Sequence, residues 1–335
     1  MNSCRRVLLL LVLTCPVALA RDQSCQVDIP VSVVLPSGGV VNRLAAGSFV
    51  AHSKDEPNIQ SLNPDLGPRR ILFVVETGKQ VTPVAREVEA AVISYILTNA
   101  RPQDSFALLT THASAKEIKF GASRAALSAA VEELKKAPEG KNVENAALDA
   151  ILDGASWLQP HQSGDAIFVL TMGIEGSHRA RYSRVRDGLV DDGIRVFGFH
   201  FGDVAQASTD ADLTSGGRRN PLTSGVAGIS SSPQPNRESL LFLSRETGGA
   251  AVKENVTGVD HSYQLTDDRL KRFQYAGLQE YKAVIESYRM TIKLPARNFA
   301  LDLTDAVREA IPSAIILYPT RLPKCGEGSK VGAVP

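Results

Sequence analysis

The stretch ILFVVETGKQV, residues 71–81, decides the fold of this chain. Its first five residues, Ile71–Val75, are apolar without a break, as in a β-strand that is buried on both faces. A short polar turn follows, and Thr82-Pro83 then supplies a helix N-cap and a proline suited to the first helical position. Beyond it, apolar residues recur on one helical face: Val84, Val88, Ala91, Val92, Tyr95 and Ile96. Strand, turn and helix predict the first unit of an open α/β sheet, whose ligands bind at the turn over 76–80.

Length and charge limit the possible function classes. The chain has 335 residues, of which 43% are hydrophobic, so it can bury a full core and hold about two domains. Its formal net charge is +1. A balance this close to zero gives no indication of nucleic acid as a partner.

The first twenty residues have the pattern of an export signal. Arg5-Arg6 is a charged start, Val7–Leu13 is an apolar run, and Ala18–Ala20 is a small-x-small cleavage site. We expect a signal peptide over 1–20, cleavage after Ala20, and a secreted or periplasmic protein. A lipoprotein signal through Cys15 stays open. The apolar run is too short to span a membrane, and no later stretch is long enough, so we expect no transmembrane segment.

Removal of the signal would leave two cysteines, one near each end of the chain. These are Cys25 and Cys325. In an oxidising compartment such a pair is a disulfide candidate. Two unrelated thiols, or a bridge between two copies, remain as alternatives.

The sequence before the opening strand predicts a separate β segment, over 21–68. Val31, Val33 and Leu35 alternate with other residues ahead of a turn at 36–39, which predicts two short strands within 26–50. Three prolines and a polar composition predict a linker over 51–70.

Buried-strand and helix patterns alternate after the opening strand, which predicts parallel pairing and a doubly wound sheet. A charged stretch at 116–120 is typical of an edge strand paired with its neighbour. The long polar stretch 203–238 predicts a flexible loop. The expected strands lie at 106–111, 166–171, 195–201 and 250–253, the expected helices at 127–134, 143–158, 182–190, 238–247 and 270–286, and two final strands at 288–294 and 314–318.

Several phrases, in this order, resemble the bacterial proteins related to von Willebrand factor type A domains. They are IPVSVVLPSGGVVNRLAAGSF (29–49), ILFVVETGKQV (71–81), ENAALDAI (144–151), AIFVLTMG (166–173) and LSRETGGAAV (243–252). The resemblance implies a three-layer, doubly wound, mostly parallel sheet over 69–286, with an N-terminal β segment and a C-terminal one (287–335) packed together beside it.

The family's metal-ion-dependent adhesion site uses Asp-x-Ser-x-Ser, a Thr and a second Asp, because Mg²⁺ needs oxygen ligands. In this sequence the first loop offers Glu76, Gly78 and Gln80 at those positions. Asn145 stands in place of the Thr, and Met172 in place of the final Asp. A thioether is a soft ligand that does not suit Mg²⁺. We therefore expect a degenerate site, with no metal and no cofactor.

Motifs of catalysis do not appear in the sequence. Gly78-Lys79 lacks the glycine and the hydroxyl that a phosphate-binding loop needs at 73 and 80, and no Gly-x-Ser-x-Gly elbow is present. The six histidines show no zinc-type spacing. His200, within an expected strand, is interpreted as a hydrogen-bonded histidine rather than a metal ligand. We therefore expect no enzyme.

Basic residues fall where the family has its metal loops. Lys79 lies in the first loop, and His178, Arg179 and Arg181 follow the expected strand at 166–171. They are either a solvated helix face or a surface for a protein partner. We expect an exported, adhesion-like protein-binding module. The alternatives are a binding domain weakly dependent on Mg²⁺ and an exported hydrolase on a Rossmann-like scaffold.

Overall fold

The structure, a computed structural model, contains one parallel and two antiparallel sheets. It describes residues 25–53, 57–77, 81–111, 117–135, 147–172, 181–201, 240–253, 265–294 and 299–322. The 203–238 stretch therefore lies outside the described residues, as do the expected signal peptide and Cys325.

The parallel sheet has five strands, and the opening stretch of sequence forms one of its inner strands. In spatial order they are β5 (Ser105–Thr110), β4 (Arg70–Val75), β6 (Ala166–Thr171), β7 (Arg195–His200) and β8 (Ala251–Lys253). Beyond β5 the charged stretch makes a single antiparallel bridge, Ile118 to Leu108. The edge position is therefore as expected, although the described residues 117–120 form no strand.

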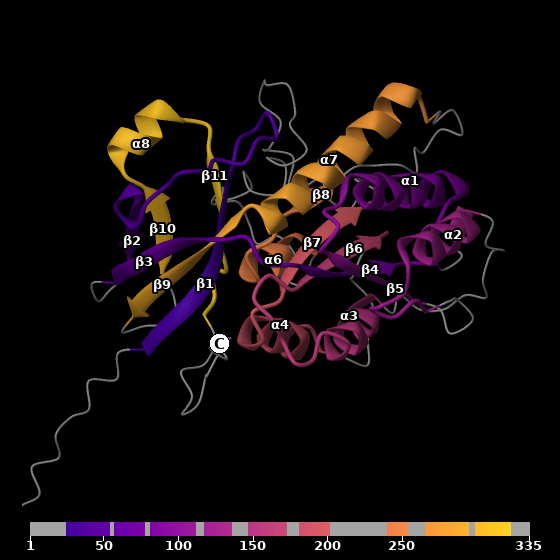
Figure 1. Cartoon of the computed structure of the whole chain (residues 1–335), viewed down its shortest axis with the longest axis horizontal. Helices are drawn as coiled ribbons and strands as arrows, with labels where there is room; N and C mark the ends of the chain where they lie inside the picture. Colours follow the sequence, from indigo (N-terminus) through magenta and orange to yellow (C-terminus); the bar gives the residue numbers. More distant parts are fainter. Residues whose placement is uncertain are drawn as a thin grey trace, which may run out of the picture.

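Helices cover both faces of this sheet, because the strands are apolar on both. Ile71 and Phe73 of β4 belong to one core and Leu72 to the other, as the alternation of a strand dictates. Figure 1 shows α1 and α7 on one side of the strands and α3 and α4 on the other. The first side has α1 (Pro83–Asn99), α2 (Arg124–Lys135) and α7 (Asp267–Ile285); the second has α3 (Ala147–Ser156), α4 (Tyr182–Asp191) and α6 (Leu240–Glu246). The expected fold class is confirmed.

The start of α1 follows the sequence signal. Thr82 is the N-cap, and its side chain accepts a hydrogen bond from the Ala85 backbone N–H at 3.1 Å. Pro83 takes the first helical position, where a missing N–H costs nothing. The helix therefore starts close to the end of β4, and its first turn lies at the carboxyl edge of the sheet.

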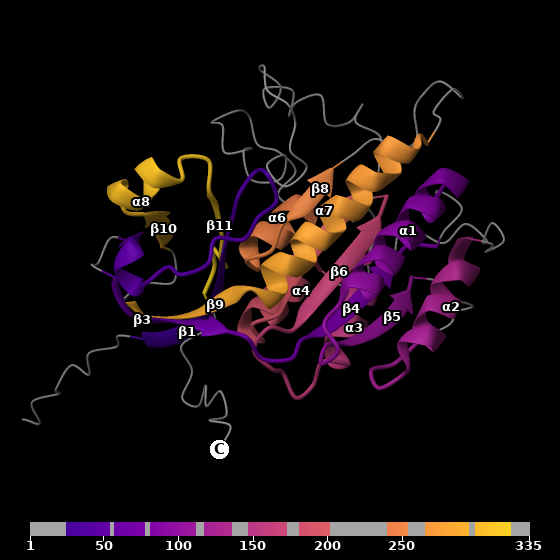
Figure 2. The same cartoon turned by 45° about the horizontal axis from the view of Figure 1, so that its top comes forward.

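Both ends of the described chain meet in the antiparallel sheets, which lie beside the α/β layers (Figures 1 and 2). The larger sheet has the order β11 (Ile315–Leu317), β1 (Cys25–Val34), β9 (Ser287–Leu294) and β3 (Asn58–Asp65). The smaller pairs β10 (Ala300–Leu303) with β2 (Phe49–His52), near the short helices η1 (Ala46–Ser48) and α8 (Asp305–Ala310).

The expected linker over 51–70 is wrong in its middle. Strand β3 occupies Asn58–Asp65 and pairs with β9. Its Pro64 is tolerated because β3 lies at the edge of its sheet, where one face of the backbone needs no partner. Prolines therefore marked an edge strand rather than a linker.

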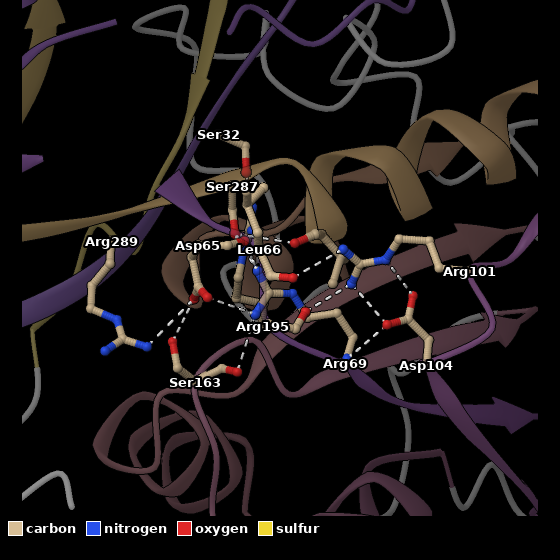
Figure 3. A network of polar contacts seen from close by, with 12 residues as sticks. Ser32, Asp65, Leu66, Arg69, Arg101, Asp104, Ser163, Arg195, Ser287 and Arg289 are labelled. Atoms are coloured by element: carbon tan, nitrogen blue, oxygen red, sulfur yellow. Dashed lines mark hydrogen bonds and ion pairs between the residues drawn. The ribbon is translucent and has the colours of Figure 1, made fainter. Parts of the chain in front are cut away.

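Two buried arginines join the antiparallel sheet to the α/β layers (Figure 3). Arg69, 1% exposed, reaches the carboxylate of Asp65 at 3.1 Å and the Ser287 hydroxyl at 3.3 Å. Arg195, also 1% exposed, donates to Gly248 O at 2.8 Å and to Ser32 Oγ at 3.1 Å. Burial, with Arg69 nearby, lowers the pKa of Arg195 to about 9.

Candidate functional site

The carboxyl ends of β4, β5, β6 and β7 meet at one edge of the parallel sheet. Backbone bonds continue past the strand ends and fix the residues that follow. Glu76 N donates to Leu170 O at 2.9 Å, and Phe201 N donates to Thr171 O at 2.9 Å. The first residue after β4 is therefore held against β6, and the first after β7 against the end of β6.

The Glu76 side chain points back into the protein. It is 1% exposed, and its Oε2 accepts from the Thr171 hydroxyl at 2.5 Å and from the Met172 backbone N–H at 2.7 Å. Both donors come from the end of the neighbouring strand β6. The extra methylene that distinguishes Glu from Asp gives the side chain more reach, and here it spans the gap between two strand ends.

Met172 and His200 continue the same line of contacts. The Nε2 atom of His200, the last residue of β7, lies 2.7 Å from Met172 O. The Met172 side chain is partly buried and packs against the core under α1 and α7. The interpretation of His200 as a hydrogen-bonded histidine is confirmed. Met172 is thus tied by its backbone to both neighbouring strands.

A second glutamate lies beneath this edge, on α1. Glu89 is 1% exposed, and its carboxyl oxygens find no hydrogen-bond partner among the described residues. Burial, and then the nearby Glu76, raise the pKa of Glu89 well above its ordinary value, while Arg86 opposes the shift. The site therefore disfavours the charged form of Glu89 relative to a glutamate in water.

Sequence reasoning missed Glu89 and its neighbour Arg86, which is 6% exposed and donates to Val81 O at 3.2 Å. The sequence does contain a pattern that could have identified Glu89. Glu89 falls on the helical stripe of Ala85 and Val92, so a charged residue stands on the buried face of α1.

The structure brings together two of the residues expected at the site, Glu76 and Met172. Arg181 is the N-cap of α4 and is exposed. Since α4 follows β6, its first turn lies at the same edge. The remaining expected positions lie outside the described residues: Gly78, Lys79, Gln80, Asn145, His178 and Arg179.

The described residues at this edge do not fit a magnesium ion. One oxygen of Glu76 already accepts two protein hydrogen bonds, and Met172 offers sulfur in place of oxygen. Across the described ranges, no group of three or more His, Cys, Asp or Glu residues is arranged to hold a metal. We therefore assign no role to a bound cation at this edge.

Within the described ranges, no helix is both long and apolar enough to cross a membrane.

Comparison with known proteins gives likenesses of structure alone. No family model matches the sequence, and no curated protein does. Among solved structures, an aerotolerance-related membrane protein of Bacteroides fragilis is similar. The match covers 64% of this chain and 98% of that protein's chain, at 13% identity and a TM-score of 0.41. The SpRpn10 VWA domain is also similar. The match covers 42% of this chain and 79% of that domain's chain, at 11% identity and a TM-score of 0.32.

A third similar structure is proximal thread matrix protein 1 of the mussel byssus. That match covers 76% of this chain but 50% of the mussel protein, at 13% identity and a TM-score of 0.40. Values this low carry no argument about ligands or partners. The order of strands, with an antiparallel bridge at the β5 edge and helices on both faces, fits a von Willebrand A-like fold for the α/β part of the chain.

Proposed function

We propose that this chain is an exported, non-enzymatic binding module that recognises an acidic group on a protein partner without a metal ion. The recognition surface is the carboxyl edge of the parallel sheet. One observation carries the proposal: Glu76, at the first metal-site position, is buried and bound to Thr171 and Met172. Its carboxylate is used to join two strands, and not to face a ligand.

The loss of the cation changes what the edge must offer to a partner. In an adhesion site of the resembled type, the metal supplies the positive charge that meets the partner's carboxylate. Here Lys79, His178 and Arg179, outside the described residues, and the exposed Arg181 supply positive charge in its place. Charge-assisted hydrogen bonds from such groups to a carboxylate are roughly twice as strong as neutral ones. The N-terminus of α1 adds partial positive charge.

The polar groups described at this edge also favour binding over catalysis. Thr171 donates its hydroxyl proton to Glu76, and His200 meets a backbone carbonyl. A general base must reach the proton that it abstracts from a substrate or nucleophile. These contacts hold the strand ends together, which gives a rigid platform for recognition.

Site-specific photo-crosslinking in the native host tests the proposal. A photoreactive residue at Ser183, exposed in the first turn of α4, leaves Arg181 in place. The matched control position is Leu66, which is 68% exposed and precedes β4 at the opposite end of its strand. We expect an adduct with one protein partner from position 183 and none from position 66.

Two treatments separate the recognition chemistry from the scaffold. A chelator should leave the adduct at its original yield, because no cation takes part. Charge reversal at Lys79, Arg179 and Arg181 together should reduce the adduct at least tenfold while leaving the melting temperature nearly unchanged, since exposed charges add little to stability. An adduct abolished by the chelator, or equal yields from positions 183 and 66, would overturn the proposal.

A further inference from the structure

Helix α1 carries two deeply buried residues of charged type one turn apart, Arg86 and Glu89. Arg86 is 6% exposed and Glu89 is 1% exposed. Side chains three residues apart in a helix lie next to each other on one face. Arginine and glutamate are almost never buried this deeply unless they are paired. Their burial together therefore indicates an electrostatic role rather than packing alone.

The Arg86 side chain runs back to the start of its own helix. Its Nη1 atom donates a hydrogen bond to the backbone oxygen of Val81 at 3.2 Å. Val81 immediately precedes the N-cap residue Thr82 and is itself 1% exposed. Long side chains on a helix point toward its N-terminus, so this direction is an ordinary one. The guanidinium group therefore lies where α1 begins, at the carboxyl edge of the parallel sheet.

Polar atoms of both side chains have no hydrogen-bond partner among the described residues. They are Nε of Arg86, a donor, and the two carboxyl oxygens of Glu89, which can accept. The two groups are thus complementary, and buried polar groups are costly unless they are compensated. Burial and then Glu76 raise the pKa of Glu89, and the charge of Arg86 acts in the opposite direction. Glu89 is therefore within electrostatic reach of both Arg86 and Glu76.

Glu76 completes a group that we call the edge cluster: Glu76, Arg86 and Glu89. The Glu76 carboxylate is tied to the end of β6 by the Thr171 hydroxyl and the Met172 backbone N–H. The cluster contains two carboxyl groups and one guanidinium group, all of them at most 6% exposed. A guanidinium group keeps its charge at any physiological pH. In the resembled adhesion site, the positive charge among the acidic residues is that of a metal ion.

We propose that the Arg86 guanidinium supplies the balancing charge that a metal ion supplies in the resembled site. It balances the carboxyl groups of the edge cluster, and its bond to Val81 holds the start of α1 beside them. Because Arg86 is buried, it is a positioning residue and does not contact the partner. The inference rests on the proposed function and deepens it, since it names the charge that keeps a metal-free edge in shape.

A double-mutant cycle, measured by urea unfolding at pH 7, tests this inference. Arg86→Met removes the charge and keeps an apolar side chain. In the original chain it leaves the carboxyl groups of the cluster without their guanidinium, and we expect the equilibrium constant for folding to fall roughly tenfold or more. In a background with Glu76→Gln and Glu89→Gln, the guanidinium is a buried charge without those carboxyl groups. There Arg86→Met should raise the constant, because it removes that buried charge.

Two further variants separate charge from packing. Arg86→Lys keeps the positive charge and should retain most of the stability that Arg86→Met loses. Arg184→Met, at an exposed position of α4, is the matched control and should change the constant by less than about twofold. If Arg86→Met does not fold in the original chain, the glutamine background still decides, because there the methionine variant should be at least as stable as its parent.

Equal losses from Arg86→Met in both backgrounds would mean that Arg86 acts through packing, and would overturn the inference. A photo-adduct from position 183 that a chelator leaves unchanged would then still support the proposed function. An adduct that the chelator abolishes would instead overturn the proposed function, and this inference with it.

Discussion

At the scale of the residue, Glu76 joins two strand ends at the carboxyl edge of the parallel sheet. An aspartate at this position would end one methylene earlier. The glutamate reaches β6 and accepts from both Thr171 and Met172, so it acts as a bridge between strands. The sequence predicts a departure from the metal-binding pattern of the resembled family on residue types alone, and this stays a prediction. It did not predict the bridge, which depends on the spacing of two strand ends.

Glu89 gives the edge a dependence on pH. Its folded-state pKa is raised by burial and by Glu76, so the folded protein holds this proton more tightly than the unfolded chain does. The pH-dependent penalty for burying Glu89 is therefore absent below the unfolded pKa of about 4.3, and it grows as the pH rises toward the folded pKa. A tenfold difference in proton affinity between the folded and unfolded chains corresponds to about 1.4 kcal/mol of stability.

Glu89→Gln should remove this cost, because glutamine has the same shape and no charge. We expect the variant to gain stability relative to the original chain as the pH rises from 5 to 8. Urea unfolding at both values measures the difference. The control is Glu87→Gln, on the exposed face of the same helix, which should change stability by less than about 0.5 kcal/mol at either pH. A loss of stability from Glu89→Gln that is larger at pH 8 would mean that the charged form is the native one.

At the scale of the element, the strands buried on both faces were the most predictable. The expected strands at 71–75, 106–111 and 166–171 are apolar except for threonines at their ends, and they became β4, β5 and β6 with shifts of one residue at most. Their signal is strong because helices cover both faces of the sheet, so nearly every position in these strands is apolar.

Elements with one exposed face were harder to predict. Strand β3 contains Pro64 and alternates half-buried with exposed residues, so it has the composition of a loop. The pairing of β2 with β10 joins segments about 250 residues apart, and no local pattern reports such a contact. The short α8 was missed as well; its residues are half-buried or exposed, so its apolar signal is weak. Tertiary contact, rather than propensity, decides these elements.

The residues of the candidate site also divide into those that the sequence predicted and those that it did not. Glu76 and Met172 were found from the sequence because they stand at the positions where the resembled family has metal ligands. Glu89 and Arg86 were missed because a helix read for its apolar stripe hides the charged residues within it. The raised pKa of Glu89 depends on its burial beneath the sheet edge, and the sequence alone does not show this burial.

At the scale of the whole molecule, the two buried arginines decide how the antiparallel sheet is held. Helix α7 ends at Ile285, and β9 begins at Ser287, so the two parts share a continuous chain. Arg69 and Arg195 fill the junction, and Asp65 is the carboxylate that faces them (Figure 3). The expected domain boundaries at 69 and 286 fall beside this junction and stay predictions.

Asp65 should therefore contribute strongly to stability. Burial acts to raise its pKa, but Arg69 and the Ser163 hydroxyl outweigh it, and the pKa lies below the ordinary value. The stabilisation is present above the unfolded pKa of about 3.9 and is lost as the pH falls through the folded pKa. Asp65→Asn leaves two buried guanidinium groups without this charge, and we expect a loss of about 3–5 kcal/mol at pH 7.

Urea unfolding measures that loss, with Asp153→Asn on the exposed face of α3 as the matched control. The control should stay within about 0.5 kcal/mol of the original chain. The difference between the Asp65 variant and the original chain should shrink as the pH falls through the lowered folded-state pKa of Asp65, because both proteins then carry a neutral side chain. A variant as stable as the control at pH 7 would mean that the junction does not depend on this ion pair.

The central claim is that the carboxyl edge works without a metal ion, and thermal unfolding in the presence of Mg²⁺ or Mn²⁺ tests it most directly. An ion bound at 100 times its dissociation constant stabilises the folded state by about 2.7 kcal/mol, which is readily seen as a raised melting temperature. We predict no change in melting temperature up to millimolar concentrations of either ion. A dose-dependent rise that Glu76→Ala abolishes would contradict the account.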